Sequence, residues 1–102
     1  MLKHIINKEE FETAIKEKPT VLVDFFAHWC GPCNSLSPIV EKVAETHPEI
    51  DVIKVDVDQA PELAAKYGVS SIPMLLSFEN GTQKDVRVGW MPEASLLRFL
   101  HL

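Results

Sequence analysis

Two apolar segments on either side of an amphipathic one constrain the fold of this chain most. Residues 20–27, TVLVDFFA, are apolar on both alternating faces, which is typical of a strand buried in the middle of a sheet. Residues 51–57, DVIKVDV, form a second strand candidate. Between them, from near Pro32, apolar residues recur at helical spacing: Leu36, Ile39, Val40, Val43 and Ala44. The order strand, helix, strand predicts a parallel βαβ unit with a right-handed crossover.

The flanking segments complete a second pattern. A strand at 2–6 and a helix at 7–18, with Asn7 as its N-cap, precede the βαβ unit, and a short helix at 61–67 follows it. The segments PMLLSFE and QKDVRVG then flank Asn80-Gly81, which predicts a β-hairpin. A last helix opens at Pro92, and its leucines are expected to face inward. We therefore expect an α/β fold in which a βαβ half precedes a ββα half, with helices on both faces of a mixed sheet.

Length and composition limit the classes of function. A chain of 102 residues, 46% hydrophobic and 25% charged, predicts one globular domain, 1–102. The net charge is −5 and no basic stripe is present, so we expect no nucleic-acid partner. No apolar run approaches the roughly 20 residues of a membrane span. The first residues do not resemble a signal peptide, so we expect a cytoplasmic protein, in a compartment where structural disulfides are rare. We also expect a monomer.

The chain's two cysteines, Cys30 and Cys33, leave three interpretations open. As a structural staple they are a poor choice, because closing a four-residue loop contributes only about 2 kcal/mol and a domain of this size needs no cross-link. As a metal site they lack partners, because zinc usually takes four ligands, His28 is too close in sequence and His47 lies at the far end of the helix. We expect neither a metal nor a cofactor.

The third interpretation is a redox pair, for which the helix supplies a mechanism. Helical spacing of three residues places the two Cα atoms about 5 Å apart, which allows a disulfide. Cys30 lies just before the helix, where free N–H groups and the helix dipole favour a thiolate. We expect Cys30 to be the exposed nucleophile and Cys33, one turn further in, to be the resolving thiol. Gly31 and Pro32 let the backbone turn tightly into the helix.

Three segments together resemble the thioredoxin family over essentially the whole chain. They are the motif WCGPC after VDFFA, the segment SIPMLLSF downstream, and VG after the hairpin. The resemblance implies the thioredoxin fold and a thiol–disulfide oxidoreductase. Such a protein reduces disulfides in protein substrates through a reversible Cys30–Cys33 disulfide. It also implies a dedicated thioredoxin reductase as partner, either flavin–NADPH or ferredoxin-linked. Two alternatives are a thioredoxin-fold oxidant or isomerase, and a binding subunit whose thiols are idle.

Two charged residues within the strands are candidate participants. Asp24 lies among apolar residues, where a lone carboxylate needs a partner or a raised pKa. It could be a structural residue, but the resemblance implies that it accepts the proton of Cys33. Lys54 matches a family lysine close to that aspartate and is a possible partner of it. Alternation alone instead directs Lys54, Asp56 and Asp58 to solvent.

Further candidates concern the substrate. Trp29, in a loop beside the nucleophile, is expected to form a partner surface, together with Gly31 and Pro32. The resemblance implies a cis bond before Pro73, which would face the cysteines and free the Ile72 backbone to pair with an extended substrate. The same resemblance places Gly89 in the substrate groove.

The chain also departs from the common family pattern at several positions. Phe26 stands where the family usually has Trp, Asn34 replaces a frequent Lys, and Met74 replaces a frequent Thr. Trp90 adds a bulky apolar group beside the expected groove. These residues bear on the choice of partner. His28 is expected to be an exposed loop residue, with the alternative that its protonated form tunes Cys30.

Overall fold

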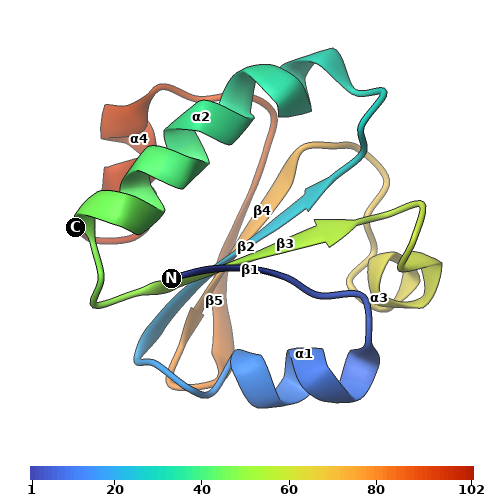
Figure 1. The fold of residues 1–102 in the computed structure, drawn as a ribbon, viewed down its shortest axis with the longest axis horizontal. Coiled ribbons are helices and arrows are strands. Elements are labelled where there is room, and N and C mark those ends of the chain that lie inside the picture. Colours follow the sequence, from blue (N-terminus) through green and yellow to red (C-terminus); the bar gives the residue numbers. More distant parts are fainter.

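A five-stranded sheet forms the centre of the structure, a computed structural model that describes residues 1–102 (Figure 1). The strand order is β1-β3-β2-β4-β5. The strands β1, β2 and β3 are parallel to one another, whereas β4 runs antiparallel to both of its neighbours, β2 and β5. Their bounds are β1 (Leu2–His4), β2 (Thr20–Phe26), β3 (Asp51–Asp56), β4 (Met74–Glu79) and β5 (Thr82–Val88). This is the mixed sheet predicted from the sequence.

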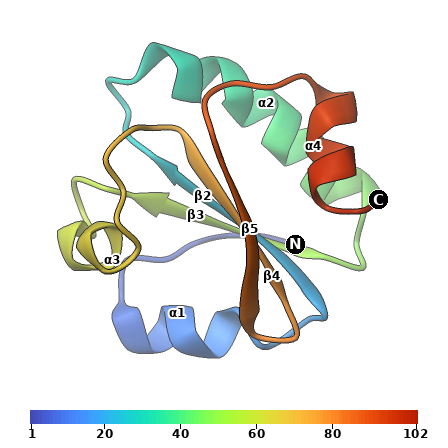
Figure 2. The same cartoon turned by 180° about the vertical axis from the view of Figure 1, so that it is seen from behind.

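Four helices cover the two faces of this sheet. α2 (Gly31–Thr46) and α4 (Glu93–Phe99) lie on one face, and α1 (Lys8–Ala14) and α3 (Pro61–Lys66) lie on the other (Figures 1 and 2). None of the four is both long and apolar enough to cross a membrane. The first helix ends at Ala14, earlier than predicted, and the chain turns before Pro19. Pro19 disfavours helical backbone at Lys18, the residue before it, so the helix cannot continue to the predicted end at residue 18.

The hairpin forms as the sequence predicts. Asn80 and Gly81 connect β4 to β5 with φ values of 51° and 82°. Positive φ at both central residues matches the twist of the flanking strands, and Asn-Gly adopts it readily.

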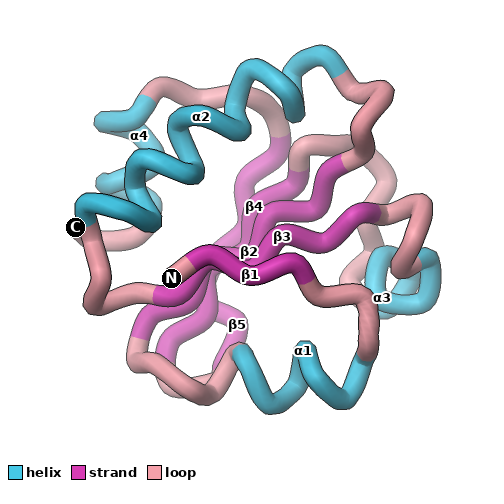
Figure 3. The backbone as a smooth tube through the Cα atoms, in the orientation of Figure 1, coloured by secondary structure: helices cyan, strands magenta, loops and turns pink.

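The two faces of the sheet bury separate apolar clusters. The cluster under α1 and α3 includes Phe11, Phe25 and Phe78, and the cluster under α2 and α4 includes Leu22 and Leu36. Because successive strand residues point to opposite faces, Leu22, Asp24 and Phe26 lie in one row on the α2 side of β2. The carboxyl end of β2 leads through a short loop into α2 (Figure 3). The row of side chains therefore ends near the start of that helix.

Candidate active site

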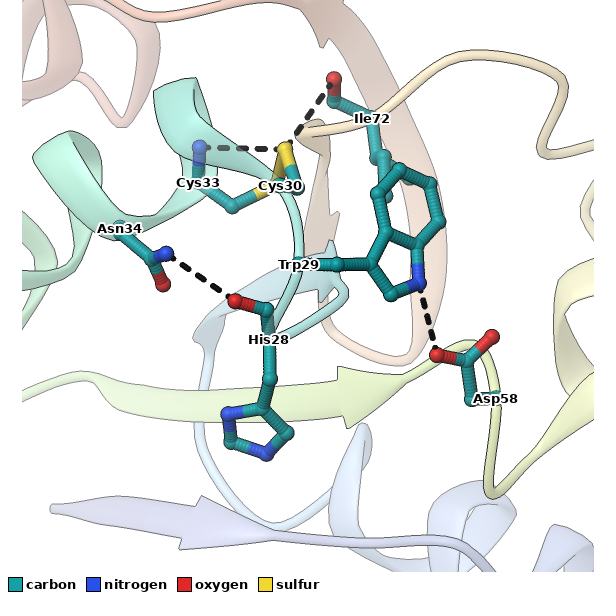
Figure 4. The surroundings of a disulfide bond; sticks show 7 residues. All are labelled: His28, Trp29, Cys30, Cys33, Asn34, Asp58 and Ile72. Carbon is teal, nitrogen blue, oxygen red and sulfur yellow. Dashed lines mark hydrogen bonds between the residues drawn. A yellow bond between two sulfur atoms is a disulfide. The ribbon is translucent and has the colours of Figure 1, made fainter.

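The two cysteines lie at the N-terminus of α2 and are joined by a disulfide (Figure 4). Cys30 is the N-cap of the helix, and its Cα lies 5.2 Å from that of Cys33. The backbone N–H of Cys33 donates a hydrogen bond to Cys30 Sγ, at 3.2 Å. Gly31 and Pro32 form the first turn between them. The spacing argument from the sequence is confirmed, because these residues can form the disulfide without distorting the helix.

Exposure does not distinguish the two cysteines, contrary to expectation. Cys30 is only 5% exposed and Cys33 is 4% exposed, because both pack in a small cluster against Val57 and Ile72. Their surroundings differ instead. Cys30 Sγ lies 3.8 Å from the carbonyl oxygen of Ile72, whereas Cys33 lines a cavity that also contains Lys54. Cys30 therefore faces the outer loop, and Cys33 borders the inner polar groups.

The loop that faces Cys30 has the backbone geometry that the resemblance implies. The Ile72–Pro73 peptide bond is cis. The carbonyl oxygen of Pro73 accepts a hydrogen bond from the N–H of Gly89, at 2.8 Å. Gly89 has a φ of 100°, which side chains other than glycine rarely allow. Gly89 thus joins the end of β5 to the proline loop beside the disulfide.

Asp24 lies in the interior, 1% exposed. Its Oδ1 atom has no hydrogen-bond partner. Burial raises the pKa of this carboxyl to about 6, against the opposing charge of Lys54, which lowers it. The pKa of Asp24 is therefore well above its ordinary value, as the sequence led us to expect of a lone carboxylate in this strand.

Lys54 does not point to solvent, so the expectation from strand alternation was wrong. Lys54 is 6% exposed and Asp56 is also buried, because α2 covers the face of the sheet on which both lie. Lys54 Nζ donates a hydrogen bond to Ser37 Oγ at 2.8 Å and lies 4.6 Å from the ring centre of Phe26. Of the three residues predicted to face outward, only Asp58 is exposed.

The loop before Cys30 presents an aromatic side chain to solvent. Trp29 is 72% exposed, and its Nε1–H donates a hydrogen bond to Asp58 Oδ2 at 2.9 Å. His28 is exposed too, but its ring points away from the disulfide, and its Nε2 lies 3.4 Å from Asp56 Oδ2 (Figure 4). The ring of His28 therefore forms no hydrogen bond with Cys30, and the alternative that its protonated form tunes Cys30 stays a prediction. Sequence reasoning missed Asp58, since nothing local links it to a tryptophan 29 residues away.

The four departures from the family pattern occupy different environments. Asn34 Nδ2 donates to the carbonyl oxygen of His28 at 3.1 Å, which ties α2 to the preceding loop. Met74 is buried in the core under α1 and α3, so it is not part of the outer surface. Trp90 is exposed, and with Pro32 it lines a shallow hollow beside the first turn of α2. Phe26, in contrast, packs with the cysteines.

A cavity of about 640 Å³ opens beside Cys33. Residues from the sheet and from the inner side of α2 line it, among them Phe26, Cys33, Ser37, Glu41 and Lys54. Ser37 and Glu41 were not identified from the sequence, because a serine and a glutamate one turn apart on a helix are ordinary surface residues. No group of three or more His, Cys, Asp or Glu side chains is placed to hold a metal ion.

Comparisons with known proteins agree on one family. The thioredoxin family model matches residues 3–101. A thioredoxin of Mycoplasmoides gallisepticum is 42% identical over 97% of this chain and 99% of its own length. One from Rickettsia bellii is 38% identical over 99% and 97%.

Solved structures give the same result. A mutant thioredoxin from Halobacterium salinarum superposes with a TM-score of 0.93 at 36% identity, over 98% of this chain and 88% of that one. Fasciola hepatica thioredoxin superposes with a TM-score of 0.90 at 38% identity, over 97% and 96%. With the Cys30–Cys33 pair at the N-terminus of α2, these matches show that the chain belongs to the thioredoxin family and is a thiol–disulfide oxidoreductase.

Proposed function

We propose that the protein reduces disulfides in other proteins, with Cys30 as the nucleophile and Cys33 as the resolving thiol. The thiolate of Cys30 attacks one sulfur of the substrate disulfide, which forms a mixed disulfide and releases the other substrate sulfur as a thiolate. The thiolate of Cys33 then attacks Cys30 Sγ. The Cys30–Cys33 disulfide forms, the second substrate thiol leaves, and two electrons have passed to the substrate.

One observation supports this assignment above the others: Cys30 caps α2 with its sulfur. The Cys33 N–H that donates to Cys30 Sγ in the disulfide is one of the free donors at the helix N-terminus. The same donor and the helix dipole favour negative charge on that sulfur when the pair is reduced. Cys33 lies within the helix and has no equivalent donor, so it follows as the second thiol.

Asp24 is the group proposed to accept the proton of Cys33 during the second step. It lies in the row of β2 side chains beneath the start of α2, and its carboxyl has a pKa of about 6. A base with a pKa near the working pH transfers protons efficiently. Lys54, on the neighbouring strand, is proposed to modulate this carboxyl through its charge.

Substrates are proposed to bind across the outer face of the disulfide. This surface consists of the exposed Trp29 with Gly31 and Pro32, and of the Ile72–Pro73 loop with Gly89, which follows β5 and is hydrogen-bonded to that loop. The carbonyl oxygen of Ile72 lies 3.8 Å from Cys30 Sγ, which has no proton to donate while it is in the disulfide. This oxygen can therefore accept a hydrogen bond from an extended peptide that adds to the loop as a strand would. Backbone pairing of this kind suits many substrate sequences.

The oxidised pair must be returned to the dithiol form by a partner. We propose a dedicated thioredoxin reductase, flavin–NADPH or ferredoxin-linked, and the cytoplasm as the compartment. Both proposals follow from the direction of the reaction, because a protein that donates electrons to disulfides works where its own pair is kept reduced.

Trapping experiments test the division of labour between the cysteines. Cys33→Ser is expected to accumulate a mixed disulfide with an oxidised protein substrate, because Cys30 attacks and nothing resolves the product. Cys30→Ser is expected to form no adduct. Mass spectrometry of both variants after incubation with the substrate distinguishes them. An adduct formed by Cys30→Ser and absent from Cys33→Ser would reverse the assignment.

A further inference from the structure

Asp24 and Lys54 occupy paired positions on neighbouring strands, yet they form no ion pair. The register of β2 and β3 places Asp24 directly beside Lys54, and both side chains lie on the face covered by α2. A buried ammonium and a buried carboxyl in such positions normally pair, because each is otherwise left desolvated. Here Asp24 Oδ1 has no hydrogen-bond partner, and Lys54 Nζ donates instead to Ser37 Oγ at 2.8 Å.

The hydroxyl of Ser37 is oriented to receive that hydrogen bond. Its proton is donated to Glu41 Oε2 at 2.9 Å, one turn further along α2. A hydroxyl has one proton and two lone pairs, so donation to Glu41 leaves its lone pairs for Lys54. The negative carboxylate also polarises the hydroxyl and makes its oxygen a stronger acceptor. Ser37 and Glu41 therefore form an acceptor for the lysine that competes with Asp24.

We propose that Ser37, oriented by Glu41, is a positioning residue that holds the Lys54 ammonium away from Asp24. The positioning itself is independent of the reaction. Its consequence for catalysis rests on the proposed function, in which Asp24 receives the proton of Cys33. An unpaired carboxyl in this position keeps a high affinity for protons, whereas a carboxylate in contact with an ammonium loses it. The raised pKa of Asp24, about 6, agrees with the first arrangement.

Other charged or titratable groups also belong to this side of the sheet. β4 presents apolar Leu75 beside Asp24, and α4 buries only apolar side chains here. The remaining groups come from the N-terminus, β1, β3, β5, α2 and the loop before Cys30: the Met1 ammonium, His4, Asp56, Arg87, Cys33, Glu41, Glu45 and His28. The Met1 ammonium lies 3.5 Å from Asp51 Oδ1 and is thus engaged at the other end of the sheet. Of these, Asp56 is engaged by His28, and Arg87 is exposed beside Phe99. Lys54 is thus the cation nearest in register to Asp24.

Titration of the Asp24 carboxyl tests the proposal directly. The measurement is the 13C chemical shift of the carboxyl against pH in the oxidised protein, where neither cysteine titrates. Ser37→Ala frees Lys54 to approach Asp24, and the Asp24 midpoint is expected about one pH unit below that of the unmodified protein. Ser35→Ala is the matched control, because Ser35 is an exposed serine of the same helix that has no hydrogen bond to Lys54 or Glu41. The Asp24 midpoint in Ser35→Ala should equal that of the unmodified protein. An Asp24 midpoint that is unchanged or higher in Ser37→Ala overturns the proposal.

A second pair of variants tests whether Ser37 acts through the lysine. In a Lys54→Met background, Ser37→Ala is expected to leave the Asp24 midpoint unchanged, since no ammonium remains to be redirected. A fall of the midpoint in that background would show a direct effect of Ser37 and contradict the proposal. Substrate reduction measured against pH separates this inference from the proposed function. If Ser37→Ala lowers the Asp24 midpoint but leaves the pH profile of turnover unchanged, the positioning stands and the role of Asp24 as proton acceptor fails.

Discussion

Asp24 is an ionisable side chain in the middle of an apolar strand, and its protonation links stability to pH. The pKa of its carboxyl rises from an ordinary 3.8 to about 6 in the folded protein. Between these values the folded state binds more protons than the unfolded state, so stability falls as the pH rises through this window. Above about pH 6 the full cost of the buried charge is present, and below about pH 4 it is absent.

Asp24→Asn is therefore expected to stabilise the protein, and more so at high pH. A pKa difference of about two units corresponds to roughly 3 kcal/mol at pH 8, and a small part of this cost is already present at pH 4. The gain in unfolding free energy at pH 8 should therefore exceed the gain at pH 4 by roughly 2–3 kcal/mol. Urea unfolding at the two pH values measures it. Glu45→Gln, the same kind of change at an exposed carboxylate of α2, is the control for the loss of one negative charge. Equal gains at both pH values would contradict the burial argument.

Trp29 exposes most of its surface while a hydrogen bond to Asp58 fixes its ring, an arrangement suited to contact with a partner. Trp29→Ala is expected to raise KM for a disulfide-bearing protein substrate several-fold. It should change the rate with a small disulfide such as oxidised glutathione much less, since a small molecule does not span the surface. Steady-state kinetics with both substrates provides the test. A similar loss with both would place Trp29 in the chemical step instead.

Among the elements, the connection between the end of β5 and the loop of Pro73 depends on the backbone conformation of Gly89, which has a φ of 100°. An added Cβ at Gly89 or at Gly31 would meet no atom within 4 Å, but only Gly89 has positive φ. Gly89→Ala is expected to cost at least about 1 kcal/mol of unfolding free energy through backbone strain alone. Gly31→Ala should leave stability equal or slightly higher. Chemical denaturation of the two variants makes the comparison, and equal stabilities would refute this account of Gly89.

The sequence predicts the elements well because their signals are local. Apolar periodicity, the Asn7 cap and the Asn80-Gly81 turn each act within a few residues, and each is present in the structure. Strand alternation alone directed Lys54 to solvent wrongly, because alternation reports which residues share a face of a strand but not what covers that face. In a sheet with helices on both sides, a charged residue within a strand is buried wherever a helix crosses it.

The site is less predictable than the fold, since it joins distant segments. The spacing of Cys30 and Cys33 and the resemblance to a family were enough to anticipate the redox pair and the cis bond before Pro73. The near-complete burial of Cys30 was not anticipated, because Ile72 and Val57 reach it from other loops. The hydrogen bond from Lys54 to Ser37 likewise requires the crossing of β3 by α2, which no local pattern encodes.

For the whole molecule, the direction of electron flow depends on how far the dithiol form is stabilised. The N-terminus of α2 favours negative charge on the sulfur of Cys30. Taken by itself, this effect stabilises the reduced form of the pair. Asp24 opposes this effect, because an ionised carboxylate beneath α2 disfavours a second negative charge on Cys33. With the two influences opposed, and with membership of the thioredoxin family, the pair is expected to act as a reductant.

The equilibrium of the Cys30–Cys33 pair in a defined redox buffer tests this conclusion most directly. The protein is equilibrated at about pH 7 in a glutathione buffer poised at about −200 mV, quenched with acid and alkylated, and its free thiols are counted by mass spectrometry. The pair is expected to stay a disulfide in this buffer and to become a dithiol when dithiothreitol replaces glutathione. A pair found mostly reduced in the glutathione buffer would identify an oxidant or isomerase instead of a reductant.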